Sequence, residues 1–84
     1  MIAESPLTIY STQWCGYCHR LMKQLDREGV AYSVVDIEDD PGAADYVMSV
    51  NGGNQTVPTL VFPDGSAATN PSIGEVKARL AGAA

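Results

Sequence analysis

The stretch Trp14-Cys15-Gly16-Tyr17-Cys18 constrains this chain most, because it holds the only two cysteines. A strand-like run at residues 7–11 precedes it, and a helix-like run at residues 20–27 follows it. Residues i and i+3 of a first helical turn share one face, so the two sulfurs lie within bonding reach. The helix N-terminus favours a thiolate at the first cysteine. The motif therefore indicates dithiol–disulfide redox chemistry, with Cys15 as nucleophile and Cys18 as resolving partner.

Length and charge limit the classes of function. The 84 residues leave room for one domain over residues 1–84 and for no second one. A disulfide that closes so short a loop adds little chain-entropy stabilisation, so the cysteine pair suits chemistry better than structural support. Ten acidic against five basic residues give a net charge of −5. This charge excludes the basic surface that nucleic-acid binding needs and disfavours an anionic membrane as a partner.

The sequence also predicts the compartment. No apolar run approaches the ~20 residues that span a bilayer. Residues 1–6 have neither the basic nor the apolar region of a signal peptide. We therefore expect a cytosolic protein without membrane partners, in a compartment where disulfides are usually transient and catalytic.

The order of the predicted elements indicates an α/β fold. Strands are expected at residues 7–11, 30–37, 59–62 and 66–69, and helices at 16–28, at 41–50 and from Ile73 onwards. The first half requires a parallel strand pair with a right-handed crossover. The turn Pro63-Asp64-Gly65 adds an antiparallel hairpin. The expected result is a four-stranded mixed sheet with helices on both faces and the cysteine pair after the first strand, where α/β proteins place their chemistry.

Local signals predict where the helices begin and end. Gly29 is a C′ stop, Asp40 is an N-cap with Pro41 at the first helical position, and Ser72 and Glu75 have capping-box spacing. The second strand, rich in Val and Ile, is expected to be covered on both faces, and the terminal alanines are expected to fray. Helical spacing places nine apolar residues inward: Leu21, Met22, Leu25, Ala44, Val47, Met48, Ile73, Val76 and Leu80.

A second motif, Thr56-Val57-Pro58-Thr59, precedes the third strand. Pro58 cannot donate a ladder hydrogen bond there, and we predict a cis Val57–Pro58 peptide bond, although only ~5% of such bonds are cis. A cis bond would turn the Val57 N–H and C=O outward, where they could pair with the backbone of a bound thiol. The alternative is a trans proline that merely starts the strand.

Together these motifs resemble a known family. Cys15-Gly16-Tyr17-Cys18, followed by Thr56-Val57-Pro58 and the Asp64-Gly65 turn, is similar to a glutaredoxin of the thioredoxin superfamily over residues 7–80. With Val50-Asn51-Gly52-Gly53-Asn54, the chain resembles more narrowly the actinobacterial mycoredoxins. The resemblance implies a thioredoxin fold with three helices around the sheet. It also implies reduction of mixed disulfides between proteins and a low-molecular-weight thiol, which is mycothiol in that family.

The resemblance also implies partners and a binding surface. Mycothiol is the expected co-substrate, and no bound cofactor is expected. S-thiolated proteins are the expected substrates, a flavoprotein disulfide reductase supplies electrons indirectly, and the protein is expected to be a cytoplasmic monomer. The residues expected around the small thiol are Gln13, Trp14, Tyr17, Thr56, Val57, Pro58, Thr69 and Asn70.

One departure from glutathione-using glutaredoxins concerns the segment before the last helix. Those proteins usually have a Gly-Gly pair followed by acidic residues that hold the γ-glutamyl end of glutathione, whereas this chain has Thr69-Asn70-Pro71-Ser72. Many also have a lysine ahead of the cysteine motif, where this chain has Thr12 and Gln13. Neutral polar groups at Gln13, Thr69 and Asn70 suit a sugar-like thiol, so we expect a preference for mycothiol.

The residues alone leave other interpretations open. Two cysteines and His19 are too few for a structural zinc site in one chain, which takes about four ligands, but a dimer could share a zinc ion or a [2Fe–2S] cluster. The cysteines could also be small buried apolar groups. A thioredoxin-like donor, reduced by a flavoprotein instead of a small thiol, is the alternative enzyme.

Some residues near the cysteine motif can also be interpreted in two ways. Trp14 is either a substrate platform or a partly buried structural indole. His19 and Arg20 are either solvated or assist the thiolate. The acidic run of Asp36, Glu38, Asp39 and Asp40 is expected to be a solvated loop with a helix cap.

Overall fold

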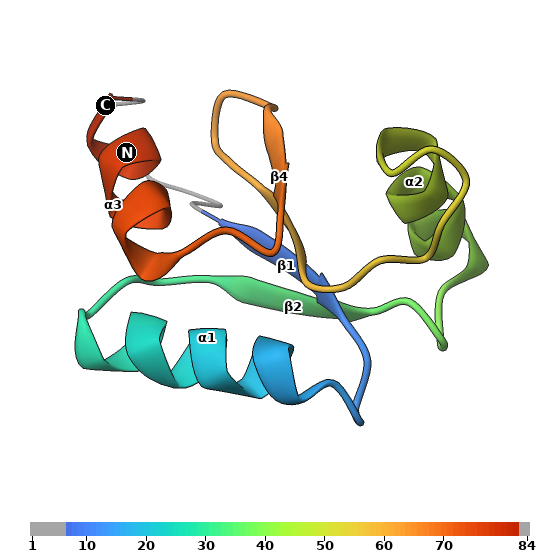
Figure 1. Ribbon diagram of the computed structural model, residues 1–84, viewed down its shortest axis with the longest axis horizontal. Coiled ribbons are helices and arrows are strands. Elements are labelled where there is room, and N and C mark those ends of the chain that lie inside the picture. The colour runs from blue at the N-terminus through green and yellow to red at the C-terminus, as the bar shows by residue number, and fades with distance from the viewer. Residues whose placement is uncertain (1–6, 83–84) are drawn as a thin grey trace.

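The computed structural model describes residues 7–82 and shows a mixed α/β arrangement (Figure 1). The order of the elements is the one that the sequence predicts. The predictions for residues 1–6 and for the terminal alanines lie outside the described residues. The elements are β1 (Thr8–Ser11), α1 (Gly16–Arg27), β2 (Ser33–Asp36), α2 (Pro41–Val50), β3 (Thr59–Val61), β4 (Ala67–Thr69) and α3 (Ile73–Gly82).

The four strands form one sheet in the order β2-β1-β3-β4. β1 pairs in parallel with β2, with Ile9 opposite Val34, and antiparallel with β3, with Ile9 opposite Leu60. β3 and β4 form the antiparallel hairpin, with Leu60 opposite Ala68. The predicted mixed sheet is therefore confirmed. β1 lies inside the sheet and is hydrogen-bonded to β2 on one side and to β3 on the other. The loop that follows β1 therefore starts from a fixed position.

Helices cover both faces of the sheet, since neighbouring residues of a strand point to opposite sides. Ile9 packs on the side of α1 and α3, whereas Tyr10 packs against the α2 cluster and contacts the ring of Tyr46. Figure 1 shows α2 standing apart from α1 and α3. The larger core cluster contains Leu7, Ile9, Leu21, Leu25, Leu60, Phe62 and Val76, and the smaller one contains Ile37, Ala43, Ala44 and Val47.

The predicted helix ends are confirmed. The Asp40 side chain accepts a hydrogen bond from the Ala43 N–H at 3.2 Å, with Pro41 next to it in the first turn of α2. The Ser72 hydroxyl accepts one from the Glu75 N–H at 3.1 Å at the start of α3. Gly29, beyond the α1 cap at Glu28, has a φ of 73°, which favours glycine.

The second strand is shorter and more exposed than predicted. The sequence predicts a strand at residues 30–37 covered on both faces, but β2 spans Ser33–Asp36 and lies at the edge of the sheet. Val34 is 49% exposed there. This prediction is wrong because a run of valines does not distinguish an edge strand from an interior strand. Met48, also predicted to point inward, is only partly buried.

Candidate functional site

The two cysteines meet at the start of α1. Cys15 is the N-cap residue, with extended backbone (φ −83°, ψ 107°), and Cys18 lies in the first turn. The Cys18 N–H donates to the Cys15 Sγ at 3.2 Å, so the sulfur occupies the place of a capping oxygen. Both cysteines are free. An N–H group aimed at Cys15 Sγ is suited to stabilise negative charge on that sulfur.

Burial distinguishes the two sulfurs. Cys15 is 5% exposed, whereas Cys18 is 0% exposed. Burial raises the pKa of the Cys18 thiol to about 12, with further contributions from the neighbouring Cys15 sulfur. Cys18 therefore keeps its proton at neutral pH. Of the two cysteines, Cys15 is therefore the one that keeps some exposure to solvent, and Cys18 is closed off from it.

The loop before β3 lies against Cys15, as the sequence predicts. The Val57–Pro58 peptide bond is cis, and the Val57 carbonyl oxygen lies 3.9 Å from the Cys15 Sγ. Pro58 is buried, and its carbonyl accepts a hydrogen bond from the Asn70 N–H at 2.8 Å. Asn70 has a positive φ of 48°, which is uncommon outside glycine. This backbone contact joins the loop before β3 to the loop before α3.

Two aromatic residues flank the cysteines on the surface. Trp14 is 72% exposed, and its Nε1 donates to the Glu38 Oε2 at 3.1 Å. The alternative of a partly buried structural indole is therefore wrong, because the ring lies out over the loop after β2. Tyr17 is 63% exposed, with the Arg20 guanidinium 5.9 Å from its ring centroid. The exposed contact with Glu38 was not predicted, since it joins residues that are 24 positions apart.

The other predicted binding residues, Gln13, Thr56 and Thr69, each take part in a hydrogen bond or polar contact within the protein. Gln13 is exposed, and its carbonyl oxygen lies 2.9 Å from the His19 Nε2, so His19 has a protein partner. Thr56 is exposed at its side chain, and its carbonyl accepts from the Thr59 hydroxyl at 2.8 Å. The Thr69 hydroxyl donates a hydrogen bond to Asn51 Oδ1 at 2.6 Å, so it already has an acceptor within the protein.

Asn51 is a structural residue of the site that the sequence reasoning missed. Its side-chain amide donates to the Val47 carbonyl at 2.8 Å and to Thr59 Oγ1 at 3.1 Å, and its oxygen accepts from Thr69. It therefore connects the end of α2 to β3 and β4. An asparagine just after a helix is a signal of local capping, but the contacts with β3 and β4 depend on the sheet.

A groove of about 310 Å³ lies between α1 and the loop before α3, and Tyr17 of the cysteine motif is part of its lining, whereas neither cysteine is. It brings the predicted residues Tyr17 and Asn70 together but is not lined by the other six, which are Gln13, Trp14, Thr56, Val57, Pro58 and Thr69. Its lining also includes Gln24 and Ser72, which were not predicted. The complete lining is Tyr17, Arg20, Leu21, Gln24, Asn70, Pro71, Ser72 and Ile73, without a carboxylate among these described residues.

Within residues 7–82, no three His, Cys, Asp or Glu side chains are grouped so that they could hold a metal ion. In the same part of the chain, each helix is too short or too polar to cross a membrane.

Comparison with known proteins agrees with this site. Residues 7–66, which include both cysteines and the loop before β3, match the sequence model of the glutaredoxin family. The chain belongs to the glutaredoxin family. Glutaredoxins are thiol–disulfide oxidoreductases, which accounts for a free cysteine pair at the start of a helix. The resemblance expected from the sequence is confirmed.

Two relatives of this glutaredoxin come from Mycobacterium tuberculosis and Corynebacterium glutamicum. It is 61% identical over 74 residues to a glutaredoxin of Mycobacterium tuberculosis, covering 88% of each chain. It is 47% identical over 76 residues to Mycoredoxin 1 of Corynebacterium glutamicum, covering 90% of this chain and 94% of the relative. The crystal structure of the glutaredoxin from Archaeoglobus fulgidus superposes with a TM-score of 0.72 at 25% identity, over 90% of this chain and 86% of that one. The thioredoxin fold is thereby confirmed.

Proposed function

We propose that this glutaredoxin reduces mixed disulfides between proteins and mycothiol. Cys15 attacks the mycothiol sulfur and releases the protein thiol, which leaves mycothiol attached to Cys15. A second mycothiol molecule then attacks this intermediate, or Cys18 displaces the bound mycothiol and forms the internal disulfide. Electrons return through mycothiol and, indirectly, a flavoprotein disulfide reductase. The observation that carries the assignment is the burial of Cys18 behind Cys15, which leaves one sulfur in reach of a substrate.

The choice of mycothiol is supported by the groove between α1 and the loop before α3, which Tyr17 of the cysteine motif helps to line. Its lining offers the neutral hydrogen-bonding groups of Gln24, Asn70 and Ser72, and the one charged group is Arg20. Such groups suit the hydroxyl-rich sugar part of mycothiol, while the acidic pair that grips glutathione is missing from residues 69–72. The 47% identity to a protein named Mycoredoxin 1 supports the same choice.

We propose that the predicted binding residues all contact the bound thiol, and we use the lining of the groove to divide them into two groups. We assign the Val57 backbone to pairing with the backbone of the bound thiol, and this assignment is supported by the 3.9 Å distance between the Val57 carbonyl oxygen and Cys15 Sγ. Tyr17 and Asn70 line the groove, and we assign Gln13, Trp14, Thr56 and Thr69 to its outer rim. We further propose that the chain works as a single domain and a monomer in the cytosol, with mycothiol as co-substrate and no bound cofactor.

The test is turnover of one peptide that carries either mycothiol or glutathione as its mixed disulfide. Each reaction contains the matching thiol and its reductase. We expect strong preference for the mycothiol conjugate. A preference for glutathione would overturn the choice of thiol, and activity only with a thioredoxin reductase would make the protein a thioredoxin-like donor.

Two variants test the roles of the cysteines. Cys18→Ser should keep activity on the mixed disulfide, because a second mycothiol can release Cys15, but it should lose the reduction of protein disulfides. Cys15→Ser should lose both activities. Equal loss in the two variants on the mixed disulfide would refute the proposed division of roles.

A further inference from the structure

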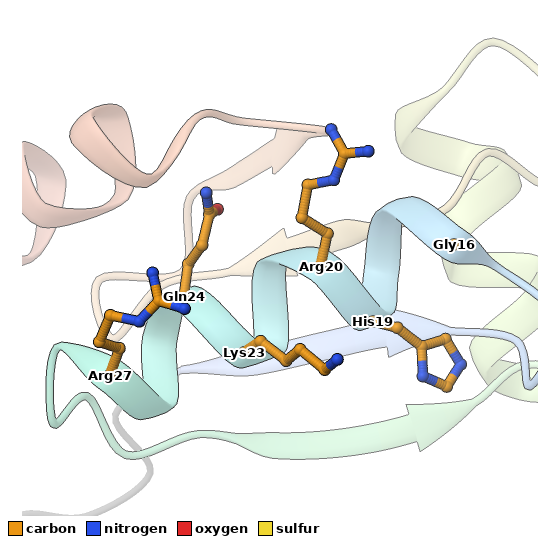
Figure 2. A pocket seen from close by; sticks show the side chains of 6 residues that line it. All are labelled: Gly16, His19, Arg20, Lys23, Gln24 and Arg27. Carbon is orange, nitrogen blue, oxygen red and sulfur yellow. The ribbon is translucent and has the colours of Figure 1, made fainter.

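The cations of this acidic protein are concentrated on one helix. Of its five Lys and Arg residues, three lie on α1, together with the only histidine. At about 100° per residue, these positions share the side of α1 opposite the buried Leu21 and Leu25. Figure 2 shows their side chains projecting from successive turns of α1, with Gly16 near the start of the helix. We call Arg20, Lys23 and Arg27, with His19 beside them, the cationic face of α1.

Among the described residues, no carboxylate forms an ion pair within 4.0 Å with this face. The ion pairs found within residues 7–82 join Lys77 to Glu28 at 2.9 Å and Arg79 to Glu75 at 3.5 Å, so they use the other two cations. Asp26, at the margin of the face, accepts a hydrogen bond from the Tyr32 hydroxyl. The cationic face therefore attracts anions although the whole protein is negative.

The cationic face borders a groove whose lining starts one residue after Cys15. The groove has a volume of about 400 Å³ and is lined by Gly16, His19, Arg20, Lys23, Gln24 and Arg27. Gly16 directly follows Cys15 in the chain, and a Cβ built on it would contact nothing within 4 Å, so the backbone there is open to a partner. An extended segment in this groove can therefore continue past Gly16 toward Cys15.

We propose that the cationic face of α1 binds an acidic segment of the client protein whose mixed disulfide Cys15 attacks. This proposal rests on the proposed function. From Gly16 to Arg27, α1 extends about 16 Å at about 1.5 Å per residue. An extended peptide at about 3.3 Å per residue covers that distance with about five residues. The acidic residues of a preferred client therefore lie within about five positions of its modified cysteine.

A second copy of the chain is a poorer occupant. Its acidic residues Asp36, Glu38, Asp39 and Asp40 could meet the cationic face, but two copies that each carry a net charge of −5 repel one another. A copy seated beside Cys15 would also cover the site that the client must reach. An acidic client protein has the charge opposite to that of the cationic face, and its modified cysteine must in any case come close to Cys15.

The test compares two peptides with a central cysteine linked to the small thiol that the assay above selects. One has aspartates on both sides of the cysteine, and the other has an asparagine in place of each aspartate. The wild-type protein should have a higher kcat/KM for the acidic peptide, and added salt should reduce this preference. Lys23→Glu should lower kcat/KM for the acidic peptide about three- to fivefold, within the range of exposed charge pairs.

Lys77→Glu is the control for the change of net charge, because Lys77 lies on α3 and does not line the groove. It also breaks the ion pair with Glu28, so urea unfolding is used first to establish that both variants are folded. Lys77→Glu should change the preference less than Lys23→Glu does, and neither variant should change turnover of the neutral peptide. Equal turnover of the two peptides by the wild type, or equal effects of the two variants, would overturn the proposal while the reductase function stands. Turnover of neither peptide would overturn both. A wild-type dimer that Lys23→Glu converts to monomer would assign the face to self-association instead.

Discussion

Replacing Asn51 tests how the fold holds the loops around the cysteines. Asn51→Ala removes three side-chain hydrogen bonds, to the Val47 carbonyl at 2.8 Å, to Thr59 Oγ1 at 3.1 Å and from Thr69 Oγ1 at 2.6 Å. It leaves the helix and strand residues in place. The variant therefore isolates the connection between α2, β3 and β4.

The size of the effect follows from these contacts. Each hydrogen bond contributes about 1 kcal/mol net, and the bond to Thr69 is exposed, which lowers its share. We therefore expect Asn51→Ala to lower the free energy of unfolding by about 2 to 3 kcal/mol. For a domain of this size, this loss corresponds to a decrease in Tm of roughly 10 to 20 °C.

Urea unfolding followed by far-ultraviolet circular dichroism measures this change. Asn54→Ala is the matched control, because Asn54 is exposed and its side chain makes one longer bond, 3.3 Å, to the Asn51 carbonyl. The control should lose no more than about 0.5 kcal/mol. If Asn51→Ala were as stable as this control, the side chain would not connect the elements as argued here.

Two further predictions concern Cys18 and Asn70. Burial is the largest cause of the raised pKa of Cys18 and remains when Cys15 is replaced, so a folded Cys15→Ser variant should still show thiolate absorbance only above the ordinary range of a thiol. In the unfolded chain the Cys18 thiol loses its proton at a lower pH than in the folded protein. Its contribution to the free energy of unfolding is therefore present at neutral pH and is lost as the pH rises from about 9 to about 12. Titration at an ordinary thiol pKa in the folded variant would contradict this. At Asn70, whose φ is 48°, Asn70→Gly should be more stable than Asn70→Ala by about 1 kcal/mol in urea unfolding. If both variants lose turnover equally while only Asn70→Ala loses stability, the amide side chain contacts the substrate.

The local parts of the fold were predictable because their causes are short-range. The caps at Asp40 and Ser72 depend on residues three positions away, and Gly29 ends a helix through its own backbone. The position of Cys15 at the start of α1 follows in the same way from the strand-like and helix-like runs around it. The cis Val57–Pro58 bond was also predicted from the sequence, because Pro58 stands directly before a strand, where it cannot donate a ladder hydrogen bond.

The properties that separate the two cysteines come from the tertiary structure. Spacing within the motif predicts that the sulfurs are close, but only the packing of α1 on the sheet buries Cys18 completely and raises its pKa. The contact of Trp14 with Glu38 and the bonds of Asn51 to β3 and β4 likewise join residues that are distant in sequence. Residue patterns report forces that act within a helical turn or along a strand. Burial and cross-strand contacts depend on which elements become neighbours, and the order β2-β1-β3-β4 decided that.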